Sequence, residues 1–200
     1  MTAARLVILL LVAAGSLAFY VPYLGEKQDE RRLAEIASTI AGRDVTIDCP
    51  GTLATLTEIS PHDGSVRFGP DGRPADVAKL SSGTCDRLRS VLGGDTSAFE
   101  CLALSAVCPQ EATRAAVAVN VLSHEAWHLA GERDEAVTQC YALQTNADTA
   151  IRLGATPAEA RAIAAHVVDR VQPALPPAYR SRDCYDGGPL DLRPDHAGWP

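Results

Sequence analysis

Residues 109–135 read PQEATRAAVAVNVLSHEAWHLAGERDE, and this stretch decides the fold. Between Pro109 and Gly131 it is mostly apolar and contains no helix breaker, which predicts one long helix that is buried on most sides. Proline is favoured at the start of a helix, and glycine commonly ends one in the left-handed conformation. A second helix is expected from about Asp134. The two helices would therefore be joined by a short turn.

The last turns of the first helix contain HEAWH at 124–128, an HExxH motif. Positions i and i+4 project from one helix face about 5–6 Å apart, a spacing at which one Zn²⁺ can take a nitrogen from each imidazole. Glu125 is rotated by about 100° from His124 and is suited to accept a proton from water rather than to bind the metal. The motif predicts His124 and His128 as metal ligands and Glu125 as the catalytic base. The same face is expected to be buried upstream of the histidines.

A catalytic zinc needs a third protein ligand, and Asp134 and Glu135 are the nearest candidates. Asp134 gives HExxHxxGxxD, the metzincin spacing with Asp in place of the third His. Metzincins also have a methionine turn beneath the metal, whereas the only methionine of this chain is Met1. Glu135 opens the next helix, which follows the gluzincin arrangement of HExxH with a Glu from a later helix. We favour Glu135 and keep Asp134, or a more distant ligand, as alternatives.

Outside this pair of helices, alternation of apolar residues and turn motifs predict a small sheet, and helical spacing predicts further helices. The expected elements are a strand at 44–51, a hairpin around 65–68, a strand at 75–80, and helices at about 85–92 and 157–171, the last with a Thr156–Glu159 capping box. The predicted fold class is α+β and zincin-like, helix-rich with a small β-sheet and a long active-site helix carrying HExxH.

The N-terminal region contains an uncharged run from Leu6 to Leu24, close to the ~20 residues that cross a bilayer as a helix. A small-residue cleavage site ending at Ala18 keeps a signal peptide open, but the apolar run continues beyond it. We expect a signal anchor at 1–24, a stalk or short helix at 25–42, and one domain at 43–200 with an irregular tail from about 173. The domain would lie on the extracytoplasmic side of the cell membrane, or be secreted after cleavage.

The six cysteines support this compartment, because all of them lie after residue 48 and none forms a CxxC pair. An even and high number of cysteines without metal-ligand spacing indicates disulfides formed outside the cytoplasm. Fifteen pairings are possible for six cysteines. Cys101–Cys108 is the shortest closure, and Cys140–Cys184 would tie the tail to the second helix, so both are hypotheses.

The charge balance argues against nucleic acid as a partner. The chain has 25 acidic and 18 basic residues and a net charge of −7, whereas binding to phosphates needs clustered Lys and Arg. An apolar content of 46% also excludes a disordered acidic chain.

The remaining histidines and tyrosines are weaker candidates for the site. His166 is expected to pack on a helix face, and His62 and His196 lie in turn-like, solvated sequence. Tyr141 or Tyr179 could donate a hydrogen bond to a developing oxyanion, and the spacing selects neither.

The segment HEAWHLAGERDEAVTQCYALQ resembles the core of a group of actinobacterial exported proteins regarded as zinc metallopeptidases. The resemblance covers about the last two-thirds of the chain. It rests on His124, Glu125, His128, Gly131, Glu135, Ala136, Cys140 and Gln144, and on Cys184, Asp186-Gly187-Gly188, Leu192 and Trp199-Pro200. It implies that Glu135 is the carboxylate ligand.

Together these features predict a membrane-anchored, extracytoplasmic zinc metallopeptidase. Zn²⁺ bound by His124, His128 and Glu135 would activate a water for attack on a peptide bond, with Glu125 as the base. The partners would be a peptide or protein substrate and, through the N-terminal helix, the membrane. The alternative is a non-catalytic zinc-containing module that binds a partner in the cell envelope.

Overall fold

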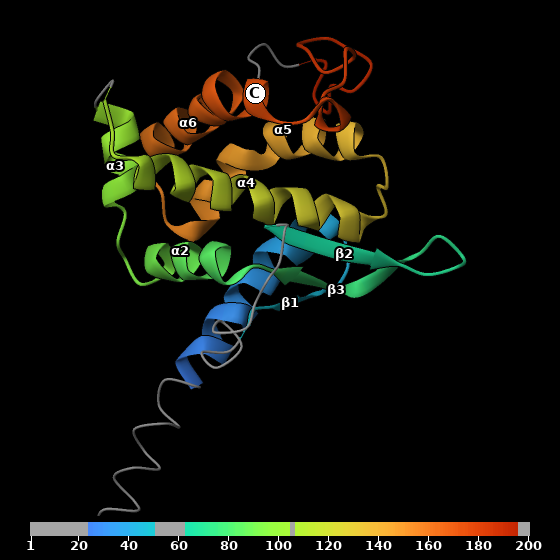
Figure 1. The fold of residues 1–200 in the computed structure, drawn as a ribbon, viewed down its shortest axis with the longest axis horizontal. Helices are drawn as coiled ribbons and strands as arrows, with labels where there is room; N and C mark the ends of the chain where they lie inside the picture. The colour runs from blue at the N-terminus through green and yellow to red at the C-terminus, as the bar shows by residue number, and fades with distance from the viewer. Residues whose placement is uncertain (1–23, 51–62, 105–106, 196–200) are drawn as a thin grey trace, which may run out of the picture.

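The computed structural model describes residues 24–50, 63–104 and 107–195. The described chain is helix-rich with one small sheet, which confirms the α+β class (Figure 1). A helix over residues 24–41 comes first. The elements that follow are β1 (Thr46–Asp48), β2 (Gly64–Phe68), β3 (Pro74–Leu80), α2 (Ser82–Leu92), α3 (Ser97–Leu104), α4 (Gln110–Ala130), α5 (Glu135–Leu153) and α6 (Pro157–His166).

The sheet has three strands in the order β1-β3-β2. β1 pairs with β3 in parallel, and β2 pairs with β3 antiparallel as the two arms of a hairpin. The hairpin turn is tight because Gly69 and Arg73 are hydrogen-bonded through their backbones and Gly72 adopts a positive φ of 79°. β1 and β2 are the two edge strands of this sheet, and β2 lies along α4 (Figure 1).

The helix α4 runs through the middle of the domain, with the sheet on one side and α5 and α6 on the other (Figure 1). Its buried positions are mainly small, which lets neighbouring helices approach closely; they include Ala112, Ala115, Ala116, Ala118 and Ala126. The helix ends where predicted, because Gly131 takes the left-handed conformation with a φ of 113°. Asp134 then caps the N-terminus of α5 by accepting hydrogen bonds from two backbone amides.

The core joins all parts of the described domain. It includes Leu33 from the helix over 24–41, Ile47 from β1, Phe99 from α3 and Leu122 from α4. The segment expected as a stalk or short helix thus forms a helix that packs into the domain core. The predicted anchor at 1–24 lies, apart from its last residue, outside the described residues. Within the described ranges, no helix combines the length and the apolar character that a membrane span requires.

Two helices differ from the sequence prediction. The eight residues of α3 are too few to show a repeat of helical spacing, so this helix gives no clear sequence signal. The helix predicted at 157–171 begins at Pro157 with the expected Thr156–Glu159 capping box, but α6 ends at His166 and continues as a wider π-helical turn over Val167–Val171.

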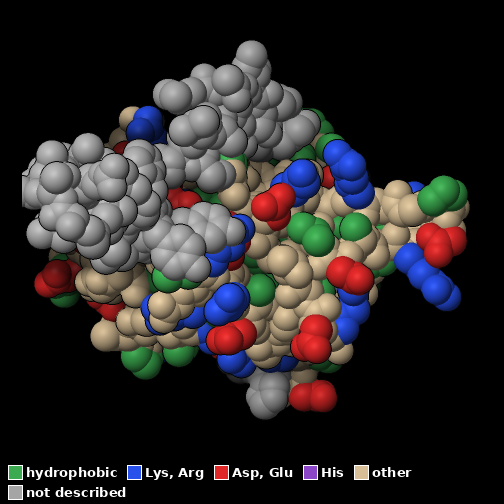
Figure 2. All heavy atoms as spheres, turned by 90° about the horizontal axis from the view of Figure 1, so that it is seen from below, with side chains coloured by type: hydrophobic (Ala, Val, Ile, Leu, Met, Phe, Trp, Pro, Cys, Tyr) green, Lys and Arg blue, Asp and Glu red, His purple; other side chains and the backbone are tan. Residues whose placement is uncertain are grey.

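Three disulfides brace the domain and confirm that the cysteines pair with one another. Cys101–Cys108 and Cys140–Cys184 are paired as hypothesised. Cys49–Cys85 ties the end of β1 to α2. On the face seen in Figure 2, acidic and basic side chains are interspersed over the described part of the surface.

Candidate metal centre

The turn between α4 and α5 brings three potential metal ligands together. His124 and His128 lie one helical turn apart on α4, with ring centroids 4.7 Å apart. Glu135 is the first residue of α5, and the chain reversal after Gly131 places it against both rings. One ligand atom from each of these three residues lies within 4.8 Å of the other two.

The distances from the Glu135 carboxylate to the two rings are close to those between ligands of one tetrahedral metal ion. Glu135 Oε2 lies 3.0 Å from His124 Nε2 and 3.4 Å from His128 Nε2. Ligands about 2.0–2.1 Å from a tetrahedral Zn²⁺ lie about 3.3 Å from one another. The donor set of two imidazoles and one carboxylate also matches catalytic zinc sites, which use three protein ligands and leave the fourth position open.

The second nitrogen of each imidazole has its own partner. His124 Nδ1 donates to Gln139 Oε1 at 3.0 Å, and His128 Nδ1 donates to the carbonyl of Glu132 at 2.8 Å. Such contacts fix the ring orientation and leave Nε2 for the metal. Both rings thus present Nε2 to Glu135 in a geometry held by the protein.

The two acidic candidates for the third ligand have different positions. Asp134 Oδ1 accepts from the backbone amides of Ala136 and Val137, so this carboxylate is used as the helix cap. Glu135 has no such role and faces the histidines. The structure therefore places Glu135, and not Asp134, in the cluster.

The ionisation of the cluster favours a bound cation. A hydrogen bond with the His124 ring lowers the pKa of Glu135, and burial lowers the pKa of His128. An ionised carboxylate and a neutral imidazole are the forms that bind a metal.

Glu125 lies beside the cluster but does not join it. It is buried, and its Oε2 has no hydrogen-bond partner among the described residues. Burial raises the pKa of Glu125 to about 8, and the negative charge of Glu135 adds to the rise. Strand β2 passes directly over it, because a Cβ on Gly64 would lie 2.7 Å from Glu125 Cγ. A desolvated carboxyl group without a fixed partner is suited to carry a proton.

A cavity of about 360 Å³ opens above the cluster. Its walls come from β2, α4, the turn before α5 and the C-terminal region; they are Gly64, Ser65, Val66, Phe68, His124, Glu125, His128, Arg133, Glu135 and Tyr179. Arg133 lies over the Phe68 ring, 5.4 Å from its centroid. The three candidate ligands and Glu125 therefore line one cavity.

The structure distinguishes the two candidate tyrosines. Tyr179 lines the cavity, with its ring centroid 5.7 Å from that of His124, whereas Tyr141 packs against Trp127. Burial raises the pKa of Tyr179, and the charges of Glu135 and Glu125 raise it further, so its hydroxyl stays protonated. Tyr179 is thus a hydrogen-bond donor at the edge of the cluster.

A chain of amide side chains connects His124 to the segment that carries Tyr179. Gln139, which accepts from His124, donates to Gln172 Oε1 at 3.0 Å, and Gln172 donates to the carbonyl of Tyr179 at 2.9 Å. Gln139 also donates to Asn120. The sequence signal for Gln139 is its place four residues after Glu135, on the same helix face. Gln172 and Tyr179 have no comparable signal.

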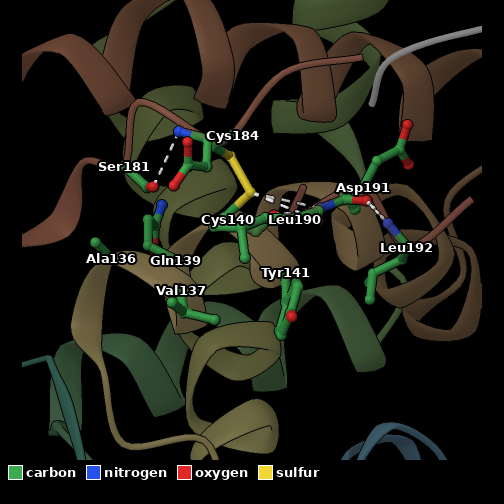
Figure 3. The surroundings of a disulfide bond; sticks show 12 residues. Ala136, Val137, Gln139, Cys140, Tyr141, Ser181, Cys184, Leu190, Asp191 and Leu192 are labelled. Atoms are coloured by element: carbon green, nitrogen blue, oxygen red, sulfur yellow. Dashed lines mark hydrogen bonds between the residues drawn. A yellow bond between two sulfur atoms is a disulfide. The ribbon is translucent and has the colours of Figure 1, made fainter. Parts of the chain in front are cut away.

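A disulfide and the hydrogen bonds of one glutamine hold the C-terminal segment, residues 172–195, on α5. The Cys140–Cys184 disulfide joins it to the middle of the helix, and Leu190 lies beside this bond (Figure 3). Gln144 donates to the carbonyl of Leu190 at 2.8 Å and accepts from the amide of Leu192 at 2.7 Å. The irregular segment is therefore fixed at several points along α5.

His166, the third histidine within the described ranges, does not join the cluster. His166 forms a hydrogen bond with Thr113 at 3.0 Å, between α6 and the start of α4, as expected for a packing residue. His62 and His196 lie outside the described residues.

Comparison of the chain with protein-family models, curated proteins and solved structures finds no match.

Proposed function

We propose that this protein is a zinc-dependent peptidase of zincin type. The observation that carries the proposal is the cluster of His124, His128 and Glu135, whose ligand atoms lie within 4.8 Å of one another. Beside it lies the buried Glu125, whose Oε2 has no hydrogen-bond partner among the described residues. A purely structural zinc site has no use for a carboxyl group next to an open coordination position. The resemblance of the HExxH segment to exported zinc metallopeptidases points in the same direction.

The residues of the site have distinct tasks in this proposal. A bound zinc would polarise both the attacking water and the peptide carbonyl. The Glu125 carboxylate accepts a proton from the attacking water and passes it to the leaving amine. The Tyr179 hydroxyl donates a hydrogen bond to the carbonyl oxygen as negative charge develops on it. Gln139 and the Glu132 carbonyl hold the two imidazoles in place.

We further propose that the domain acts outside the cytoplasm, attached by an N-terminal anchor or released by cleavage. Three disulfides support an oxidising compartment. The uncharged run at 6–24 supports an anchor or a signal peptide.

The test is hydrolysis of a mixed library of synthetic peptides by the full-length protein, followed by mass spectrometry. Glu125→Gln should lower the cleavage rate by about 10²–10⁴-fold and keep the zinc, because it removes the proton carrier and no ligand. Glu111→Gln makes the same change at the far end of α4 and should alter neither the cleavage rate nor the zinc content. Zinc binding without any cleavage by the wild type would favour the non-catalytic binding module instead.

A further inference from the structure

A second cavity, of about 440 Å³, lies beside the metal centre. It shares four residues with the first cavity, namely Gly64, His124, Glu125 and Tyr179. We call this second cavity the apolar recess. Because Glu125 and His124 form part of both, a peptide bound across the cluster would place one of its side chains into the recess.

Five apolar residues form most of the recess wall beyond the cluster, together with the polar Asp63, Asn120 and Gln139. Val117 and Val121 come from α4, Val171 from the π-helical turn, and Leu175 and Pro176 from the C-terminal segment. Val117 and Val121 share the helix face of the histidines, which was expected to be buried at this level. Instead both valines are only half-buried and line the recess.

Away from the metal centre, the recess offers no cation to an anionic group. Within the described ranges its lining includes the acidic Asp63 and contains no Lys or Arg. The first cavity differs, because Arg133 forms part of its wall. A side chain that enters the recess therefore gains from burying apolar surface and would be repelled if it were acidic.

We infer that the recess is the specificity pocket of the enzyme and takes an aliphatic or aromatic side chain next to the bond that is cut. This inference rests on the proposed zinc peptidase function, since the metal centre fixes where the substrate backbone lies. Apolar walls on three structural elements define a side-chain pocket, and polar groups at its mouth hold the backbone.

The experiment measures the affinity of the zinc-loaded, full-length protein for a series of peptidyl hydroxamates by titration calorimetry. The hydroxamate group binds zinc in every member, and the variable side chain is isobutyl, benzyl, hydroxymethyl or carboxymethyl. We expect the isobutyl and benzyl compounds to bind at least tenfold more tightly than the hydroxymethyl compound, because they bury apolar surface. The carboxymethyl compound should bind most weakly.

Two variants and a control assign the preference to the recess. Leu175→Ser should remove most of the preference for isobutyl and leave the zinc affinity unchanged. Val117→Phe places a larger side chain on the α4 wall of the recess. It should weaken the binding of the benzyl compound more than that of the isobutyl compound. Ile151→Ser changes an apolar residue of α5 that is 45% exposed and does not line the recess, so it should have no effect.

The two proposals fail in different ways. Equal affinity for all four hydroxamates would overturn the specificity pocket and leave the zinc site intact. A protein that binds no zinc, or whose zinc binds no hydroxamate, would overturn the proposed function and the pocket with it.

Discussion

The turn between α4 and α5 and the C-terminal segment both contribute to the metal cavity, but they are held in place by different means. His124, His128 and Glu135 are brought together within 12 residues by two helix ends. Tyr179 reaches the same cavity from a segment that has little regular structure of its own. It depends on Gln139 and on the Cys140–Cys184 disulfide. The ligand cluster is thus a local feature of the chain, and the cavity around it is not.

Loss of the Cys140–Cys184 disulfide should have the largest effect. It should lower the stability of the protein while leaving the ligand cluster able to bind zinc. The double change Cys140→Ser and Cys184→Ser should lower the free energy of unfolding by about 2–5 kcal/mol, because it releases a long loop. Zinc affinity should change far less, since no ligand lies in the released segment. Thermal unfolding and a zinc titration measure the two effects. A variant that loses both zinc affinity and stability would show that the ligand cluster also depends on the C-terminal segment.

Tyr179→Phe tests the contribution of the C-terminal segment to the chemistry. Removal of one hydrogen-bond donor to a developing oxyanion lowers kcat by about 10²–10³-fold. Steady-state kinetics on a peptide cleaved by the wild type should show this loss with zinc content unchanged. Tyr141→Phe is the matched control, because this ring packs on Trp127 and does not line the cavity. Equal losses in both variants would show that Tyr179 has only a structural role.

Gln139→Leu should break the connection between the two regions. Loss of the partner of a zinc-binding histidine lowers metal affinity by about 10–100-fold. Gln144→Leu is the control, since Gln144 also ties α5 to the C-terminal segment but contacts none of the ligands. Competition with a zinc-binding dye measures both affinities. Equal zinc affinity in the two variants would show that the contact between Gln139 and His124 does not support metal binding.

Asp134→Ala should have the smallest effect. It removes the N-cap of α5 and should lower the free energy of unfolding by about 1 kcal/mol, which chemical denaturation can measure. Asp134→Asn keeps a capping oxygen and should stay close to the wild type. A large loss in both variants would indicate that the carboxylate has a role other than capping.

The local part of the site could be predicted from the sequence. The HExxH spacing on a breaker-free helix fixes one face for both histidines, and Gly131 marks the reversal that returns the chain. The choice between Asp134 and Glu135 was open on spacing alone. It is decided by capping, because Asp134 Oδ1 binds the first amides of α5 whereas Glu135 lies against both histidines.

The rest of the site depends on contacts between residues distant in sequence. Gln172 lies 33 residues after Gln139, and the position of Tyr179 follows from their hydrogen bond. The close approach of β2 to Glu125 depends on sheet pairing and on the small size of Gly64. No period or motif encodes these contacts. The sequence therefore predicts the ligands better than the cavity that surrounds them.

We propose that His124, His128 and Glu135 together bind one zinc ion. The most direct test is the zinc content of the purified full-length wild type, Glu135→Ala and Asp134→Ala, measured by mass spectrometry after dialysis. We expect about one zinc per chain in the wild type and in Asp134→Ala, and loss of zinc in Glu135→Ala, because Glu135 and not Asp134 faces both histidines. A wild type without zinc, or a Glu135→Ala variant that retains it, would contradict the account.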